Sequence, residues 1–185
     1  MRSLVYTISK SDKDLLGILE LQRKNHSANL LAEEISTQGF VTVIHSLENL
    51  RNLNDIQPHI ICKNNGKVIA YLLAMTAKSR NEIPVLIPMF KIFETLIFKG
   101  KLISEYNYVV VGQVCVDKNY RGMGVLDKCY SKYKLHLKDK YDFAITEISS
   151  RNSRSINAHK RIGFSEIYKY VSHNQKEWSV VVLEW

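Results

Sequence analysis

The stretch NYRGMGVLDKCY, residues 119–130, decides the fold. A near-continuous apolar run ends just before it, at Val116, which is typical of a strand buried on both faces. An apolar stripe at helical spacing begins within it, at Leu126, Cys129, Tyr130, Tyr133 and Leu137. We therefore predict a buried strand, a turn through residues 117–120 and a helix from about 122 to 138.

The turn has the features of an anion site. The first amides of a helix have no partners inside the helix, and the helix dipole is positive at that end. Gly122 and Gly124 present no side chain to obstruct a ligand, and Arg121 adds positive charge. A Walker loop would need Gly-Lys-Ser/Thr, and a dinucleotide fingerprint would need glycine in place of Asp127. The turn is predicted to bind a pyrophosphate, the alternative being a tight turn with an arginine in water.

The remaining pattern indicates an α/β fold with a mixed central β-sheet flanked by helices. Asn65-Gly66 between two apolar runs is typical of a hairpin, and Gly112 inside the buried strand indicates a bulge. Gly163 is a helix stop. The expected strands are 3–8, 59–63, 67–76, the run ending at 116, 142–149, 164–172 and 177–185. The expected helices follow Ser11, lie within 30–55, and cover 122–138 and 152–163.

Residues 77–106 form an apolar insert within what we interpret as a single domain, 1–185. The insert contains Pro84 and Pro88, is longer than an ordinary connection, and has a short helical pattern around Ile92 and Leu96. It could be a helix that closes the core, an apolar wall for a substrate, or a dimer face.

Composition limits the function classes. The 185 residues are 45% hydrophobic and 24% charged, as in soluble globular proteins, and the net charge of +8 suits a phosphate-bearing partner or simply solvated lysines. The three cysteines have no metal-ligand spacing, which favours a reducing compartment, and no metal is expected. Without a signal-like or membrane-spanning run, we expect a cytoplasmic protein.

Two motifs resemble those of the GNAT superfamily of N-acetyltransferases. VCVDKNYRGMGVL, residues 114–126, is similar to its motif A, Arg/Gln-x-x-Gly-x-Gly/Ala, with Leu126 where Gly or Ala is usual. NSRSINAHKRIGF, residues 152–164, is similar to its motif B, with His159 where that family usually has tyrosine. The resemblance covers roughly residues 107–168 and implies a GNAT-like fold.

The resemblance implies acetyl-CoA as the cofactor. The pantetheine arm would lie along the bulged strand, the pyrophosphate on the amides of the glycine turn, and Asn152 would contact the cofactor arm. The implied cofactor-binding residues are Val114, Cys115, Val116, Arg121, Gly122, Met123, Gly124, Val125, Leu126 and Asn152.

The same resemblance implies direct acyl transfer to a primary amine, with a strand amide near Val116 stabilising the oxyanion. His159 is the candidate acid, as an imidazolium with a pKa near 6.5, or it packs beside Ile156 and Ile162. Glu147 is the candidate base, or an exposed strand carboxylate.

The acceptor is expected to be a small-molecule or peptide amine, with no nucleic-acid or membrane partner and a possible homodimer. Two other functions stay open. Leu126 and the missing tyrosine are consistent with a non-catalytic CoA-binding module. The net charge of +8 alone motivates a nucleic-acid binder.

Overall fold

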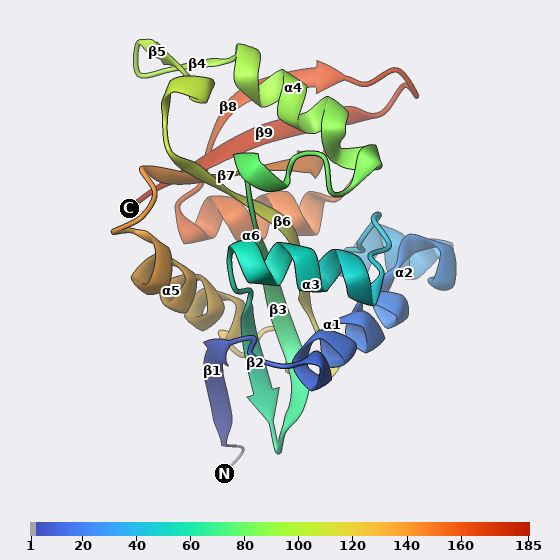
Figure 1. Cartoon of the computed structure of the whole chain (residues 1–185). Helices are drawn as coiled ribbons and strands as arrows, with labels where there is room; N and C mark the ends of the chain where they lie inside the picture. Colours follow the sequence, from blue (N-terminus) through green and yellow to red (C-terminus); the bar gives the residue numbers. More distant parts are fainter. Residues whose placement is uncertain (1–2) are drawn as a thin grey trace.

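The computed structural model describes residues 3–185, apart from the side chains at 36 and 37. Its centre is a seven-stranded sheet in the order β1-β2-β3-β6-β7-β9-β8, in which only β6 and β7 are parallel (Figure 1). The strands are β1 (Leu4–Ile8), β2 (Ile60–Asn64), β3 (Lys67–Thr76), β6 (Tyr108–Val116), β7 (Phe143–Ser149), β8 (Ser165–Val171) and β9 (Glu177–Glu184). The predicted mixed α/β sheet is confirmed.

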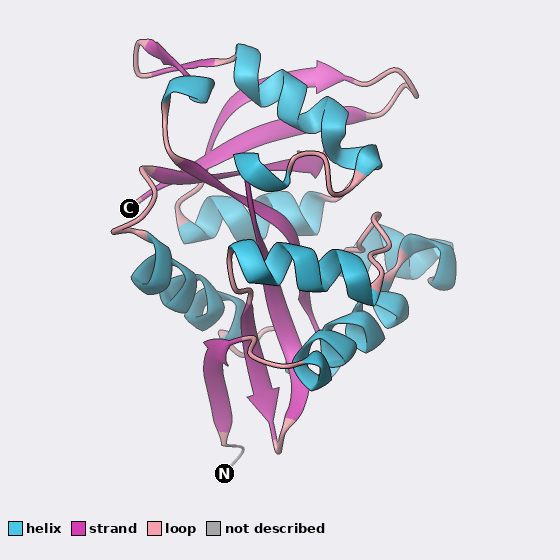
Figure 2. Ribbon diagram, in the orientation of Figure 1, coloured by secondary structure: helices cyan, strands magenta, loops and turns pink. Residues whose placement is uncertain are grey.

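Helices cover both faces of this sheet (Figure 2). The helices α5 and α6 pack on one face through a core that includes Cys129 and Tyr133, and α1 and α3 pack on the other around Tyr71. The α-helices are α1 (Asp12–Asn25), α2 (Ala32–Gln38), α3 (Leu47–Ile56), α4 (Ile87–Thr95), α5 (Val125–Leu137) and α6 (Ser153–Ile162).

The apolar insert closes the core. Its helix α4 buries Met89, Phe90 and Phe93 against β6, β7 and β9. The helix expected around Ile92 and Leu96 is present, but it ends at Thr95, and Leu96 packs on the same core just beyond it. A short hairpin, β4 (Ile97–Phe98) with β5 (Lys101–Leu102), follows the helix.

Two local predictions are confirmed in backbone detail. Asn65 and Gly66 join β2 and β3 with φ values of 47° and 77°, both left-handed, as a type I′ turn requires. Gly112 is skipped in the β3–β6 ladder, since Leu73 pairs with Gln113 and Ala74 with Val111. A Cβ on Gly112 would lie 2.3 Å from the Met75 sulfur, so the bulge requires glycine.

The bulge comes where β6 and β7 part. These strands pair only through Tyr108 with Phe143, Val109 with Ala144 and Val110 with Ile145. Beyond those pairs, the backbone of residues 113–116 has no ladder to β7. The sheet therefore opens in its middle and leaves an unpaired edge next to the glycine turn.

The helix after this turn begins later than predicted. Gly122 and Gly124 adopt φ values of 74° and 71°, which are not helical, and α5 begins at Val125. The expected start at 122 was wrong because helical periodicity alone does not show that glycines take left-handed conformations.

Candidate active site

A cavity of about 400 Å³ lies between the open edge of β6, the glycine turn and the start of α6. Its lining includes ten of the residues on which the sequence analysis relied: Val114, Cys115, Val116, Arg121, Gly122, Gly124, Val125, Leu126, Asn152 and His159. Met123 is not among the lining residues, and its side chain is 58% exposed.

The glycine turn forms one end of this cavity. Lys128 N–H donates to Gly124 O (3.2 Å), so the amides of residues 125–127 precede the helical ladder of α5. A Cβ at Gly122 or Gly124 would meet no described atom within 4 Å, so both positions face open space. Successive amides beside left-handed glycines form a concave anion site, which fits a pyrophosphate.

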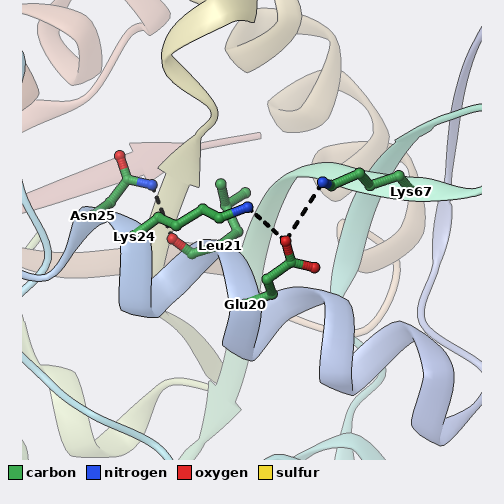
Figure 3. Close-up of polar contacts among 5 residues, drawn as sticks. All are labelled: Glu20, Leu21, Lys24, Asn25 and Lys67. Atoms are coloured by element: carbon green, nitrogen blue, oxygen red, sulfur yellow. Dashed lines mark hydrogen bonds and ion pairs between the residues drawn. The ribbon is translucent and has the colours of Figure 1, made fainter.

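Arg121 lines the cavity, but its guanidinium is bound to protein. Nε donates to Val116 O (3.0 Å), one terminal nitrogen donates to Gln38 O (2.9 Å), and the other donates to Asn25 Oδ1 (2.6 Å). Figure 3 shows Asn25 at the end of α1, where its Nδ2 donates back to Leu21 O. Arg121 thus ties α1 and the end of α2 to the end of β6, instead of simply adding charge to the cavity as predicted.

Figure 3 also shows Glu20 of α1 between Lys24 and Lys67. The contact to Lys67 (3.4 Å) links the helix to the start of β3. All three side chains are exposed, so these ion pairs add little stability. The helix is linked to the site by Arg121 at Asn25 Oδ1 and by Val41 N–H, which donates to Asn25 O (3.0 Å).

Asn152 binds the backbone just after Gln38, on the side of the cavity formed by α6. Its Oδ1 accepts from Ser155 N–H (3.2 Å) as the cap of α6, and its Nδ2 donates to Phe40 O (3.1 Å). We call residues 38–41 the anchored segment, because Arg121 and Asn152 hold it from opposite ends. The amide predicted to contact the cofactor arm is engaged with protein.

Gly39 in the anchored segment has no room for a side chain. Its φ is +71°, and a Cβ would lie 3.1 Å from Asn152 Oδ1. We expect Gly39→Ala to unseat the segment and to weaken acetyl-CoA binding about ten-fold, since its φ of 71° and ψ of 158° lie in a region essentially restricted to glycine, where another residue costs roughly 1–3 kcal/mol. Calorimetric titration measures this affinity.

Gly66→Ala is the matched control for that substitution. Gly66 also has a positive φ, +77°, with nothing within 4 Å, so alanine there is strained but far from the cavity. Both variants should lose stability, and only Gly39→Ala should lose affinity. Equal affinities in the two variants would show that the anchored segment has no part in the site.

A second, smaller cavity of about 90 Å³ lies in the opening between β6 and β7. Apolar walls come from Phe40, Val43 and Trp178, and Glu147 supplies the one carboxylate of the lining. Six residues line both cavities, which therefore meet there: Phe40, Val41, Val114, Asn152, Ser155 and His159. No residue of the 77–106 insert lines either cavity, so the expected substrate wall is not found there.

Glu147 has the character of a base. It lies on β7, two positions beyond the last pair with β6, and accepts a hydrogen bond from the Tyr170 hydroxyl (2.5 Å). Burial raises the pKa of Glu147 to about 7, and the bond from Tyr170 works in the opposite direction. The carboxylate is half-buried in a cavity wall, and not the exposed strand carboxylate of the alternative interpretation.

His159 does not match the proton donor that was expected. It is 2% exposed; its Nε2 contacts the Tyr130 hydroxyl (2.7 Å) and its Nδ1 contacts Ser155 O (2.8 Å). Ser155 O can only accept, so Nδ1 carries the proton and Nε2 accepts from Tyr130. Burial lowers the pKa of His159 to about 4, and the imidazole is therefore neutral at pH 7.

The family follows from the sequence match. The model of the acetyltransferase (GNAT) family matches residues 15–164, which includes the glycine turn, the opening in the sheet and α6. The chain belongs to the GNAT acetyltransferase family. It is an acetyl-CoA-dependent N-acetyltransferase. No protein with a curated description matches the sequence.

Solved structures share the fold of this N-acetyltransferase at low sequence identity. Arabidopsis thaliana NAA60 in complex with acetyl-CoA has 10% identity and a TM-score of 0.65, covering 98% of this chain and 99% of that one. The ribosomal-protein-S18-alanine N-acetyltransferase from Escherichia coli has 12% identity and a TM-score of 0.62, with coverage of 98% and 94%. The NatC complex bound to Gag peptide and CoA has 14% identity and a TM-score of 0.65, with coverage of 99% of each chain.

Several residues of the acetyltransferase site were missed by sequence reasoning. The larger cavity is also lined by Arg154 and Arg161, and by Asn25 and the anchored segment. The two arginines lie in the quoted motif B, where their charge was a usable signal. Residues 38–41 lie in the segment 30–55, where the sequence predicted a helix without bounds, and Asn25 lies at the end of the helix expected after Ser11, where nothing in the sequence marked it as a site residue.

Cys115 is among the residues that line the cavity, and it is 6% exposed. Burial raises the pKa of the Cys115 thiol to about 12, so it is protonated and unsuited to be a nucleophile. Among residues 3–185, no group of three or more His, Cys, Asp or Glu is placed to hold a metal ion. Within the same range, none of the acetyltransferase's helices has the length and apolar character to cross a bilayer.

Proposed function

We propose that this N-acetyltransferase, acting as one domain over residues 1–185, transfers acetyl directly to the primary amine of a small-molecule or peptide acceptor. The observation that carries the proposal is the meeting of two cavities at six shared residues, with Glu147 in the smaller one. The larger cavity suits a long, anionic cofactor, and the smaller one suits a short, uncharged chain bearing one amine.

The residues for cofactor binding follow from the geometry. The amides from Gly122 to Leu126 would hold the pyrophosphate, and the unpaired backbone of Val114–Val116 would pair with the pantetheine amides as a further strand does. Acetyl-CoA, when bound, supplies an activated thioester carbonyl. Three features support this fit: the open edge, the left-handed glycines and the arginines lining the same cavity.

The chemistry of transfer uses Glu147. At pH 7 and above its carboxylate accepts the proton of an incoming ammonium, and the neutral amine then attacks the carbonyl. A backbone amide of the open edge near Val116 donates to the oxyanion that forms. Direct transfer is favoured over a covalent enzyme intermediate, because the Cys115 thiol is buried and protonated.

The single carboxylate in the smaller cavity limits which amines can serve as the acceptor. The smaller cavity is lined by one carboxylate, so a polyamine would bury a second ammonium there without a partner. NatC was solved with a peptide, and the Escherichia coli enzyme is named for an alanine of a ribosomal protein. A peptide amino terminus with a small first residue is therefore the first acceptor to test.

The three cysteines are buried and unpaired, which supports the cytoplasm as the location. A homodimer stays a prediction.

The test is thiol release from acetyl-CoA with an array of such peptides, alkyl amines and polyamines. We expect saturable acetyl-CoA binding and amine-dependent release, with polyamines poor. Binding with no turnover on any amine would instead support the non-catalytic CoA-binding module. A salt-dependent mobility shift of DNA would instead support the alternative that the protein binds nucleic acid.

A further inference from the structure

The place of the reacting sulfur follows from the two cavities. Acetyl passes from the cofactor in one cavity to the amine in the other, so the thioester must lie where they meet. The side chains there come from Phe40, Val41, Val114, Asn152, Ser155 and His159. The departing thiolate needs a hydrogen-bond donor from this set or from the backbone.

Comparison of these six residues favours one side chain. Phe40, Val41 and Val114 have no polar side-chain atom, and His159 is a neutral imidazole whose one proton, on Nδ1, is directed at Ser155 O. The Asn152 amide nitrogen has two N–H groups, but its place is fixed by the bond to Phe40 O and by the cap that its Oδ1 forms on α6. The Ser155 hydroxyl is the donor at the junction that donates to no carbonyl or carboxylate among the described residues.

The contacts of Ser155 prepare it to donate. Its Oγ lies 3.3 Å from His159 Nδ1, whose N–H also reaches Ser155 O at 2.8 Å. The hydroxyl oxygen thus receives a weaker share of the same N–H, and its own proton is available for a bond in the junction. Tyr130 fixes this arrangement, because its hydroxyl donates to Nε2 and sets the tautomer of the ring.

We propose that the Ser155 hydroxyl donates a hydrogen bond to the departing thiolate, and that His159 is a positioning residue for it. This inference rests on the proposed acetyl transfer. As the tetrahedral intermediate collapses, the carbon–sulfur bond breaks with its electron pair passing to sulfur. The serine keeps its proton, because an alkyl hydroxyl is a weaker acid than a thiol, and the thiolate takes its proton from water.

Free CoA gives a readout that does not depend on turnover. If Ser155 donates to the thiolate, the pKa of the bound CoA thiol should lie about one unit higher in Ser155→Ala than in wild type, which is a ten-fold change in ionisation. The ultraviolet absorbance of the thiolate, followed against pH, measures it. Ser155→Ala should also lower kcat about ten-fold with acetyl-CoA affinity unchanged, and Ser155→Thr should restore both.

Ser153→Ala is the matched control, since Ser153 is exposed on the same helix and lines neither cavity. An unchanged thiol pKa and kcat in Ser155→Ala, beside an active wild type, would overturn the inference and leave the proposed function intact. A wild type that binds CoA but transfers to no amine would overturn both. A fall in melting temperature, without a shift in the thiol pKa, would show a structural role only.

Discussion

Gly124→Glu is expected to lower the affinity for acetyl-CoA by at least about 100-fold. The position faces open space at the anion-binding end of the larger cavity, with φ +71°. A carboxylate there would lie near the pyrophosphate, and at about 5 Å with an effective dielectric constant near 20 the repulsion is roughly 3 kcal/mol. Calorimetric titration of wild type and variant with acetyl-CoA measures the loss.

Two controls separate charge from backbone strain. Gly124→Ala introduces the same left-handed strain without the charge, and we expect it to keep most of the affinity. Gly66→Glu introduces strain and charge at an open hairpin with φ +77°, remote from the cavity. If Gly124→Glu binds as well as Gly66→Glu, the pyrophosphate does not lie on this turn.

Glu147→Gln is expected to lower kcat by about 10² to 10⁴, the usual contribution of a general base. The amide is nearly isosteric and can still contact Tyr170, so folding and acetyl-CoA affinity should be preserved. Because the base must be ionised, kcat/KM of wild type should rise with pH through about 7. In Glu147→Gln that rise should be absent. Steady-state kinetics with the best amine, from pH 5.5 to 9, provide both readouts.

Tyr170→Phe also tests whether Glu147 is the base, but through a change in the pKa of Glu147 rather than through a loss of kcat. The Tyr170 hydroxyl lowers the pKa of Glu147, so its removal should move the rise in kcat/KM to higher pH. Glu166→Gln, an exposed carboxylate on β8, should leave the profile unchanged. An unaltered midpoint in Tyr170→Phe would mean that another group controls the pH dependence.

The parts of the fold that the sequence predicts well are those fixed by neighbouring residues. Asn65-Gly66 needs no distant partner to turn a hairpin, and Asn152 caps α6 through an amide three residues along. The glycine turn was predictable on the same ground, since a strand end, two glycines and a helix start are all local; its binding of an anion stays a prediction.

The hydrogen-bond partners of the side chains in the site were not predictable, because these partners are distant in the sequence. Arg121 donates to Gln38, 83 positions earlier, and Asn152 donates to Phe40, 112 positions earlier. His159 has its pKa lowered by burial, and its Nε2 contacts the hydroxyl of Tyr130, on another helix. Periodicity shows which residues face a core, but not which polar atoms meet there.

The sheet is joined in its middle by only three residue pairs, from Tyr108–Val110 to Phe143–Ile145, at the end away from the site. These six residues join two halves of the sheet. One half carries the glycine turn, and the other carries Glu147. Substitutions that change the bulk of the six residues would alter the angle of the gap without touching either ligand. Variants selected for new acceptors should therefore include changes at this remote seam as well as in the cavity walls.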